Sequence, residues 1–225
     1  MRISRFMSSV ALAMAFVASV LVATTLSSSG ANASSLIEDG DFSLPAQGGG
    51  YNTYYSGING WSNSNDGVEI GTSTLYGLPC ISAGCQHLEV NANKFGTVSQ
   101  TVSGLNIGET YNLVFDYGGR PGGGPQILDV SFGGAFLAED TGSYGAWTLN
   151  SFLVVATSNT EKLTFLSVDT SGVGGNPSYG NEITNVALFA TPLPSTWTML
   201  IAGFIGLGFF AYHGTKKKAA SVVAA

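Results

Sequence analysis

Nine side chains in the middle of the chain combine aromatic rings with hydrogen-bonding groups: Tyr51, Tyr54, Tyr55, Asn63, Asp66, Arg120, Tyr144, Trp147 and Tyr179. Aromatic faces can stack on a pyranose ring, while amide, carboxylate and guanidinium groups direct its hydroxyls. These are the candidate ligand-binding residues. Two alternatives stay open, because the tyrosines can equally pack within a loop and Arg120 can pair with a nearby acid.

Catalytic residues are not expected. The sequence lacks a G-x-S-x-G nucleophile motif. His87 is the only histidine between the terminal segments, and a lone histidine opening a strand is typical of a structural role. Adjacent acids such as Glu139 and Asp140 are typical of a solvated loop, whereas a glycosidase needs two carboxylates that converge in a cleft. A binding or structural protein is therefore expected, and not an enzyme.

The charge distribution sets the class of partner. The chain has 225 residues, with 14 acidic and 8 basic side chains. All 14 acids lie within residues 34–190, against only Lys94, Arg120 and Lys162, which gives this segment a formal charge of −11. Nucleic-acid binding needs a basic face and is excluded. The aromatic content, 13 Phe, 9 Tyr and 3 Trp, argues against a disordered chain.

The two ends predict export. Arg2 and Arg5 precede the apolar run 6–22, and small residues follow up to Ala33, a layout typical of a signal peptide (1–33) removed by signal peptidase after Ala33. An uncleaved anchor is the alternative. Near the other end, the apolar run 197–212 before the lysine cluster 216–218 predicts a transmembrane helix with a cytoplasmic tail (219–225). A buried core helix is the alternative there. The ectodomain would span residues 34–190.

Cys80 and Cys85 are the only cysteines, and both lie in the exported segment. A close pair in an oxidising compartment favours one small disulfide loop. Metal binding together with His87 is the alternative, although two thiolates and one histidine do not complete a usual zinc set.

The fold prediction rests on short β-rich stretches with turn residues between them. In residues 110–117, every second side chain (Tyr111, Leu113, Phe115 and Tyr117) is apolar or aromatic, as in a half-buried strand. Further stretches of this kind are 87–90, 97–102, 126–132, 151–156, 162–168 and 182–189. Short strands separated by glycine turns favour an all-β sandwich.

The C-terminal segment resembles the PEP-CTERM sorting signal of bacterial exported proteins. The resemblance covers residues 191–218: the motif Pro192, Leu193, Pro194, Ser195, Thr196 and Trp197, then the apolar run and the lysines. Leu193 stands where the family usually has Glu. The resemblance implies the inner membrane and an exosortase-like processing enzyme as partners, and a cell-surface or extracellular-matrix location after processing.

The middle segment resembles galactose-binding-like jelly-roll domains, which include carbohydrate-binding modules. The matching pieces are 39–42, Gly60-Trp61, 87–90, 98–102 and 183–188. The resemblance implies a jelly-roll β-sandwich with Trp61 in its core and extracellular polysaccharide as a possible ligand. It also implies a structural calcium in many members, for which Asp39, Asp41 and Glu182 are the candidate ligands here. The first hypothesis is a polysaccharide-binding surface protein; the alternative is a structural or adhesive one, and a glycosidase or esterase ranks last.

Overall fold

The computed structural model describes residues 34–64, 67–72, 74–141, 144–191, 200–209 and 212. The predicted signal peptide (1–33), the sorting motif (192–197) and Asp66 lie outside the described residues. Residues 200–209 are helical. The expected spanning helix over 197–212 is not found: among the described residues, no helix is both long enough and apolar enough to cross a membrane.

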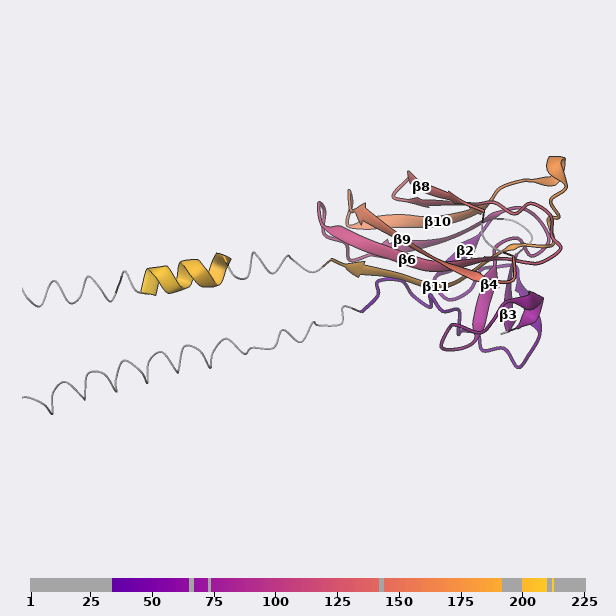
Figure 1. Cartoon of the computed structure of the whole chain (residues 1–225), viewed down its shortest axis with the longest axis horizontal. Helices are drawn as coiled ribbons and strands as arrows, with labels where there is room; N and C mark the ends of the chain where they lie inside the picture. Colours follow the sequence, from indigo (N-terminus) through magenta and orange to yellow (C-terminus); the bar gives the residue numbers. More distant parts are fainter. Residues whose placement is uncertain are drawn as a thin grey trace, which may run out of the picture. The chain divides into compact units, whose positions relative to one another are not determined.

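The described strands form two antiparallel sheets (Figure 1). The six-stranded sheet has the order β1 (Tyr51–Tyr54), β3 (Val68–Thr72), β4 (Gln86–Glu89), β11 (Asn181–Ala190), β6 (Thr110–Gly119), β9 (Trp147–Val155). The five-stranded sheet has the order β2 (Trp61–Asn63), β5 (Thr97–Ser103), β10 (Thr160–Ser167), β7 (Leu128–Phe132), β8 (Ala135–Asp140). Two 3-10 turns, η1 (Leu75–Gly77) and η2 (Ser171–Val173), lie in the connections. This architecture is all-β and consistent with a jelly-roll sandwich, as predicted.

The core lies between the two sheets. The alternating residues of β6 from Tyr111 to Tyr117 are buried, as the period-two pattern predicted. The ring of Phe115 meets that of Phe165 on β10 edge-on, with centroids 5.1 Å apart, and so joins the sheets. Trp61 is 3% exposed and its indole N–H donates to the carbonyl of Glu38 at 3.0 Å, which confirms its predicted core role.

The seven predicted strands are all present, and the sequence pattern missed β1, β2, β3 and β8. β1 and β8 are mostly exposed edge strands, so neither shows an alternation of buried and exposed residues. β2 has only three residues. β3 is buried on both faces, because loops cover the outer side of the sheet at this point.

The predicted disulfide is confirmed, since Cys80 and Cys85 are bonded and their Cα atoms lie 5.0 Å apart. The bridge closes a short loop between η1 and β4. The alternative of a metal site built on these thiols is therefore wrong, because disulfide sulfurs are no longer thiolates.

Candidate functional site

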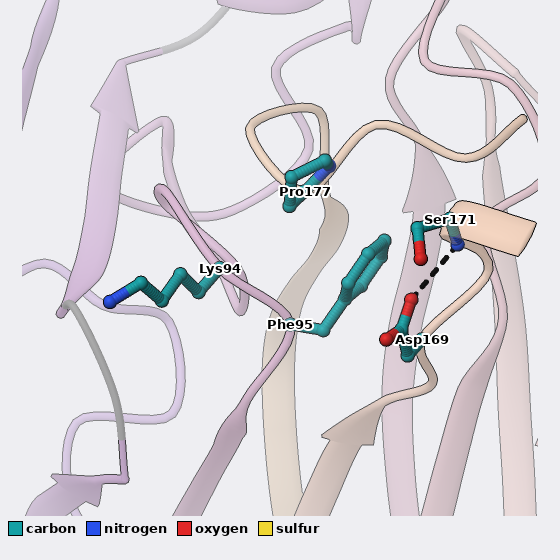
Figure 2. Close-up of a pocket in the computed structure, with 5 residues that line it drawn as sticks. All are labelled: Lys94, Phe95, Asp169, Ser171 and Pro177. Atoms are coloured by element: carbon teal, nitrogen blue, oxygen red, sulfur yellow. Dashed lines mark hydrogen bonds between the residues drawn. The ribbon is translucent and has the colours of Figure 1, made fainter.

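A pocket of about 350 Å³ opens between two connecting segments of the sandwich (Figure 2). The loop between β4 and β5 contributes Lys94 and Phe95, and the connection between β10 and β11 contributes Asp169, Ser171 and Pro177. We call this the loop-end pocket. In Figure 2 the Phe95 ring lies between Pro177 and the Asp169–Ser171 turn, and the Lys94 side chain extends away from them.

Hydrogen bonds from buried groups join the two segments to each other and to the loop before β7. Asn91 is fully buried; its amide donates to the carbonyl of Pro177 at 3.1 Å and its oxygen accepts from the backbone of Asn181 at 3.0 Å. The hydroxyl of Thr170 donates to the carbonyl of Pro125 at 2.7 Å. A Cβ at Gly175 would lie 1.8 Å from that same hydroxyl oxygen, so only glycine allows this approach. The walls of the pocket are therefore fixed rather than loosely placed.

The lining suits a small polar ligand with an apolar face. Phe95 and Pro177 supply ring surfaces, and Ser171 supplies a hydroxyl. The backbone N–H of Ser171 donates to Asp169 at 2.9 Å, and hydrogen bonds from Ser171 lower the pKa of this exposed carboxyl. Asp169 is thus an ionised acceptor at neutral pH, able to receive hydroxyl groups.

A second arrangement, the Arg120 stack, consists of Tyr76, Arg120 and Tyr179. The guanidinium carbon of Arg120 lies 3.5 Å from the ring centroid of Tyr76 and 4.1 Å from that of Tyr179. Its Nη1 donates to the carbonyl of Ser178 at 3.2 Å and to a carboxylate oxygen of Glu89 at 3.3 Å. Two aromatic faces and an ion pair therefore hold one of the few basic side chains of the domain.

Beneath the stack, three buried glutamates lie side by side across the outer face of the six-stranded sheet. Glu69 on β3 is opposite Glu89 on β4, and Glu89 is opposite Glu182 on β11. We call Glu69, Glu89 and Glu182 the glutamate row; they are 5%, 1% and 0% exposed. Tyr76 donates its hydroxyl hydrogen bond to Glu69. Gly180 allows the Glu89 side chain to pack this closely because glycine has no Cβ; a Cβ at this position would lie only 2.4 Å from the Glu89 side chain.

Burial controls the protonation of this row. Burial, and next the charge of Glu69, raises the pKa of Glu89 to about 8, while Arg120 lowers it. Burial and the charges of Glu89 and Glu69 raise the pKa of Glu182 well above its ordinary value. At neutral pH Glu89 is therefore largely protonated, and burial favours the protonated form of Glu182 as well, which limits the repulsion within the row.

His87 continues the cluster on β4. Its Nε2 lies 3.6 Å from Glu182, and burial lowers its pKa to about 4. Its ring packs edge-on against Tyr76 and Trp147, with centroids 6.4 and 5.8 Å away. His87 is therefore a neutral, buried group, as expected of a structural histidine.

The predicted ligand residues separate into two groups. Arg120, Tyr179 and Trp147 join the stack and its surroundings, and Tyr51, 56% exposed, reaches Tyr76 with a centroid distance of 6.3 Å. The others show local contacts. The Asn63 amide donates to the carbonyl of Tyr54, the Tyr54 hydroxyl accepts from Gln47, the Tyr144 hydroxyl donates to the carbonyl of Gly124, and Tyr55 is 68% exposed.

The expected calcium ligands do not assemble. Glu182 lies in the glutamate row, whereas Asp39 accepts hydrogen bonds from Ser43 and Leu44 in its own turn and from Asn59 in the connection between β1 and β2. Among the described residues, no three His, Cys, Asp or Glu side chains are grouped so that they could hold a metal ion. Calcium binding through Asp39, Asp41 or Glu182 stays a prediction, and the described residues offer no cluster of three such ligands for it.

The pocket residues and Tyr76 were missed by sequence reasoning. A weak signal was available for the pocket, since Lys94 is one of three basic residues in the domain and precedes an aromatic residue in an Asn- and Gly-containing loop. No comparable signal points to Asp169, Ser171 or Pro177. These residues become neighbours of Phe95 only when the loops that follow β4 and β10 meet at one place.

Comparison with known proteins gives no family assignment. No protein-family model matches the chain. It is 29% identical over 149 residues to halomucin from Haloquadratum walsbyi, a match that covers 64% of this chain and 2% of that protein. The chain thus spans about 2% of the length of the curated relative that it matches.

Carbohydrate-binding modules are among its structural neighbours. A family 61 module in complex with β-1,4-galactotriose aligns with a TM-score of 0.47 and 16% identity, over 70% of this chain and 99% of that one. A family 35 module from Clostridium thermocellum aligns with a TM-score of 0.42 and 10% identity, over 63% of this chain and 98% of that one. A tailspike domain of bacteriophage CBA120 aligns with a TM-score of 0.45 and 13% identity, over 70% of this chain and 21% of that one. Because every one of these TM-scores is below 0.5, the alignments do not assign a ligand to this chain.

Proposed function

We propose that residues 34–190 form a non-catalytic, galactose-binding-like domain that binds a neutral sugar unit of a polysaccharide in the loop-end pocket. The pocket itself carries this proposal. Its volume, about 350 Å³, lies in the range of small-ligand sites. The Phe95 and Pro177 rings offer apolar surface to the C–H face of a pyranose, and ionised Asp169 and the Ser171 hydroxyl offer hydrogen bonds to its hydroxyls.

Binding without turnover fits the placement of the carboxyls. Hydrolysis of a glycosidic bond uses two carboxyls on opposite sides of the bond. Among the described residues, Asp169 is the only carboxylate that lines the loop-end pocket. Glu89 and Glu182, which have the strongly raised pKa values of a general acid, lie buried beneath Arg120.

Affinity electrophoresis against a panel of neutral and acidic polysaccharides tests the binding proposal. We expect retardation by at least one neutral polysaccharide, and a loss of about tenfold in affinity, about 1.4 kcal/mol, in Phe95→Ala. Asp169→Asn keeps an oxygen that can accept the hydrogen bond from the Ser171 N–H but removes the charge, so its affinity for the polysaccharide should fall several-fold. Phe136→Ala and Glu139→Gln, which change exposed side chains on β8, are the matched controls.

A separate arm tests the tyrosines that the sequence indicated. Tyr54→Ala and Tyr55→Ala should leave binding unchanged if the pocket is the site. Loss of binding in these two variants, with Phe95→Ala unaffected, would move the site to the tyrosine loop. Failure of every polysaccharide to retard the protein would favour the structural or adhesive alternative, and depolymerisation of any of them would indicate an enzyme.

The location of the protein is the second part of the proposal. The signal-peptide pattern of residues 1–33 and the PEP-CTERM-like motif 192–197 support export and processing at the cell surface or in the extracellular matrix. Mass spectrometry of the protein from producing cells should show a mature N-terminus at Ser34 and loss of the lysine-bearing tail. Recovery of the intact chain from the cytoplasm with both cysteines reduced would contradict export.

A further inference from the structure

β9 (Trp147–Val155) is an edge strand without the usual protection. It is the last strand of the six-stranded sheet and, among the described strands, pairs only with β6. An edge strand presents free backbone N–H and C=O groups, which proteins usually protect with charges, proline, bulges or a short length. β9 has nine residues, WTLNSFLVV, without a charge or a proline, and its register with β6 is unbroken.

The outer face of β9 is also apolar. Leu149, Leu153 and Val155 are 69%, 72% and 55% exposed. With Ser151 they form every second residue of the strand and so lie on the same face. The opposite face turns inward, where Phe152 stacks on Phe115 with a centroid distance of 6.1 Å. A solvent-exposed leucine strip beside free backbone groups marks an interaction surface.

We propose that β9 pairs antiparallel with β9 of a second copy of this chain, about a two-fold axis through Ser151. The spacing of the side chains is self-complementary about this axis. Leu149 of each copy comes opposite Leu153 of the other, and Trp147 opposite Val155, so the outer-face pairs are apolar except the central one, which joins the two Ser151 residues. The pairing joins the two six-stranded sheets edge to edge.

Charge favours this edge over the remaining surface. Two copies of a segment with a formal charge of −11 repel each other, and β9 offers a contact strip that carries no charge. Two acids flank the strip: Asp116 is opposite Leu149 on β6, and Asp140 of β8, in the other sheet, accepts a hydrogen bond from the β9 residue Asn150 at 2.6 Å. One pair of strands is a small interface, so we expect a reversible dimer with a Kd on the order of 10–100 µM.

Disulfide trapping of the full chain in mild detergent tests this geometry. In the dimer the two copies of residue 151 face each other, whereas residue 148 faces residue 154. Under mild oxidation Ser151→Cys should therefore form a covalent dimer at least tenfold faster than Thr148→Cys, the matched control on the same strand. Adding Leu153→Lys to Ser151→Cys should slow trapping at least tenfold by placing charges at the interface, and adding Ile107→Lys, at an exposed site on another loop, should not.

The results distinguish pairing of β9 with a second copy of this chain from pairing with a different protein. Equal trapping of Ser151→Cys and Thr148→Cys, or trapping that Leu153→Lys leaves unchanged, would overturn the two-fold pairing. Trapping of Ser151→Cys to a different protein would also overturn it, and would assign the edge to a foreign strand. Circular dichroism of each variant checks the fold, since all four positions are exposed.

Discussion

The outer face of the six-stranded sheet has two contrasting regions. Across β3, β4 and β11 it carries three glutamates that are at most 5% exposed beneath the Arg120 stack. On β9, along the same sheet, it carries leucines that are about 70% exposed. Carboxylates are usually exposed to water and leucines buried, and both regions reverse this distribution.

The difference comes from the covering segments and not from the strands. Tyr76 of η1, Arg120 after β6 and Tyr179 before β11 lie over the glutamate row, and each makes a direct contact in the stack. Tyr76 donates a hydrogen bond to Glu69 and Arg120 pairs with Glu89, whereas both carboxyl oxygens of Glu182 lack a hydrogen-bond partner among the described residues; burial is offset there by the raised pKa, which favours the protonated form. Side-chain burial on this sheet is thus decided by loops that come from distant parts of the sequence.

Removing the cation should have the largest effect on this contrast. Arg120→Ala leaves Glu89 buried without a counter-charge, and we expect a loss of about 3 kcal/mol in the free energy of unfolding at pH 9. The loss should be smaller at pH 6, where Glu89 holds its proton. Urea unfolding at both pH values measures the effect, with the exposed Lys162→Ala within about 0.5 kcal/mol of wild type as control. A loss independent of pH would show that Arg120 acts only through packing.

The protonation of the row predicts an intermediate effect of pH. Because the folded-state pKa of Glu89 is raised to about 8, its contribution to stability is full below about pH 4.5 and is lost as pH rises through about 8, and the raised pKa of Glu182 acts in the same direction. We expect a decline on the order of 1 kcal/mol per pH unit between pH 6.5 and 8. This window avoids His87, whose lowered pKa acts in the opposite direction at acid pH. Glu89→Gln should flatten the profile in urea titrations, and Glu139→Gln should leave it unchanged; equal slopes in both variants would refute the assignment.

The uncovered region predicts the smallest effect. Leu153→Ala removes a side chain that is 72% exposed, so in dilute solution, where copies are apart, the free energy of unfolding should change by at most about 0.5 kcal/mol. The matched change in the core on β6, Leu113→Ala, should cost about 3 kcal/mol. Thermal and urea unfolding of both variants compare them. Comparable losses would mean that the β9 face is covered in solution by another part of the chain.

Much of the fold could be predicted because it depends on local pattern. The alternation in β6 and β10 identifies their buried faces, and the spacing of Cys80 and Cys85 fits the observed disulfide. The strands that lack alternation were missed for a physical reason: β3 is covered on both faces, and β1 and β8 are edges with mostly exposed side chains.

The candidate site was only partly predictable. Arg120 and Tyr179 were recognised as groups that could bind, and the structure brings them together, but it pairs the arginine with Glu89. The pocket around Phe95 and Asp169 has almost no sequence signature, because single residues in two loops look like ordinary loop residues.

By its sequence alone, the chain determined its strand faces, its acid-rich character and the place of its disulfide, since each depends on residue type and near neighbours. Only the tertiary structure decided that Glu69, Glu89 and Glu182 share one row, that Tyr76 and Tyr179 enclose Arg120, and that β9 has an open edge. Those results depend on strand order and register, which come from contacts between residues far apart in the chain.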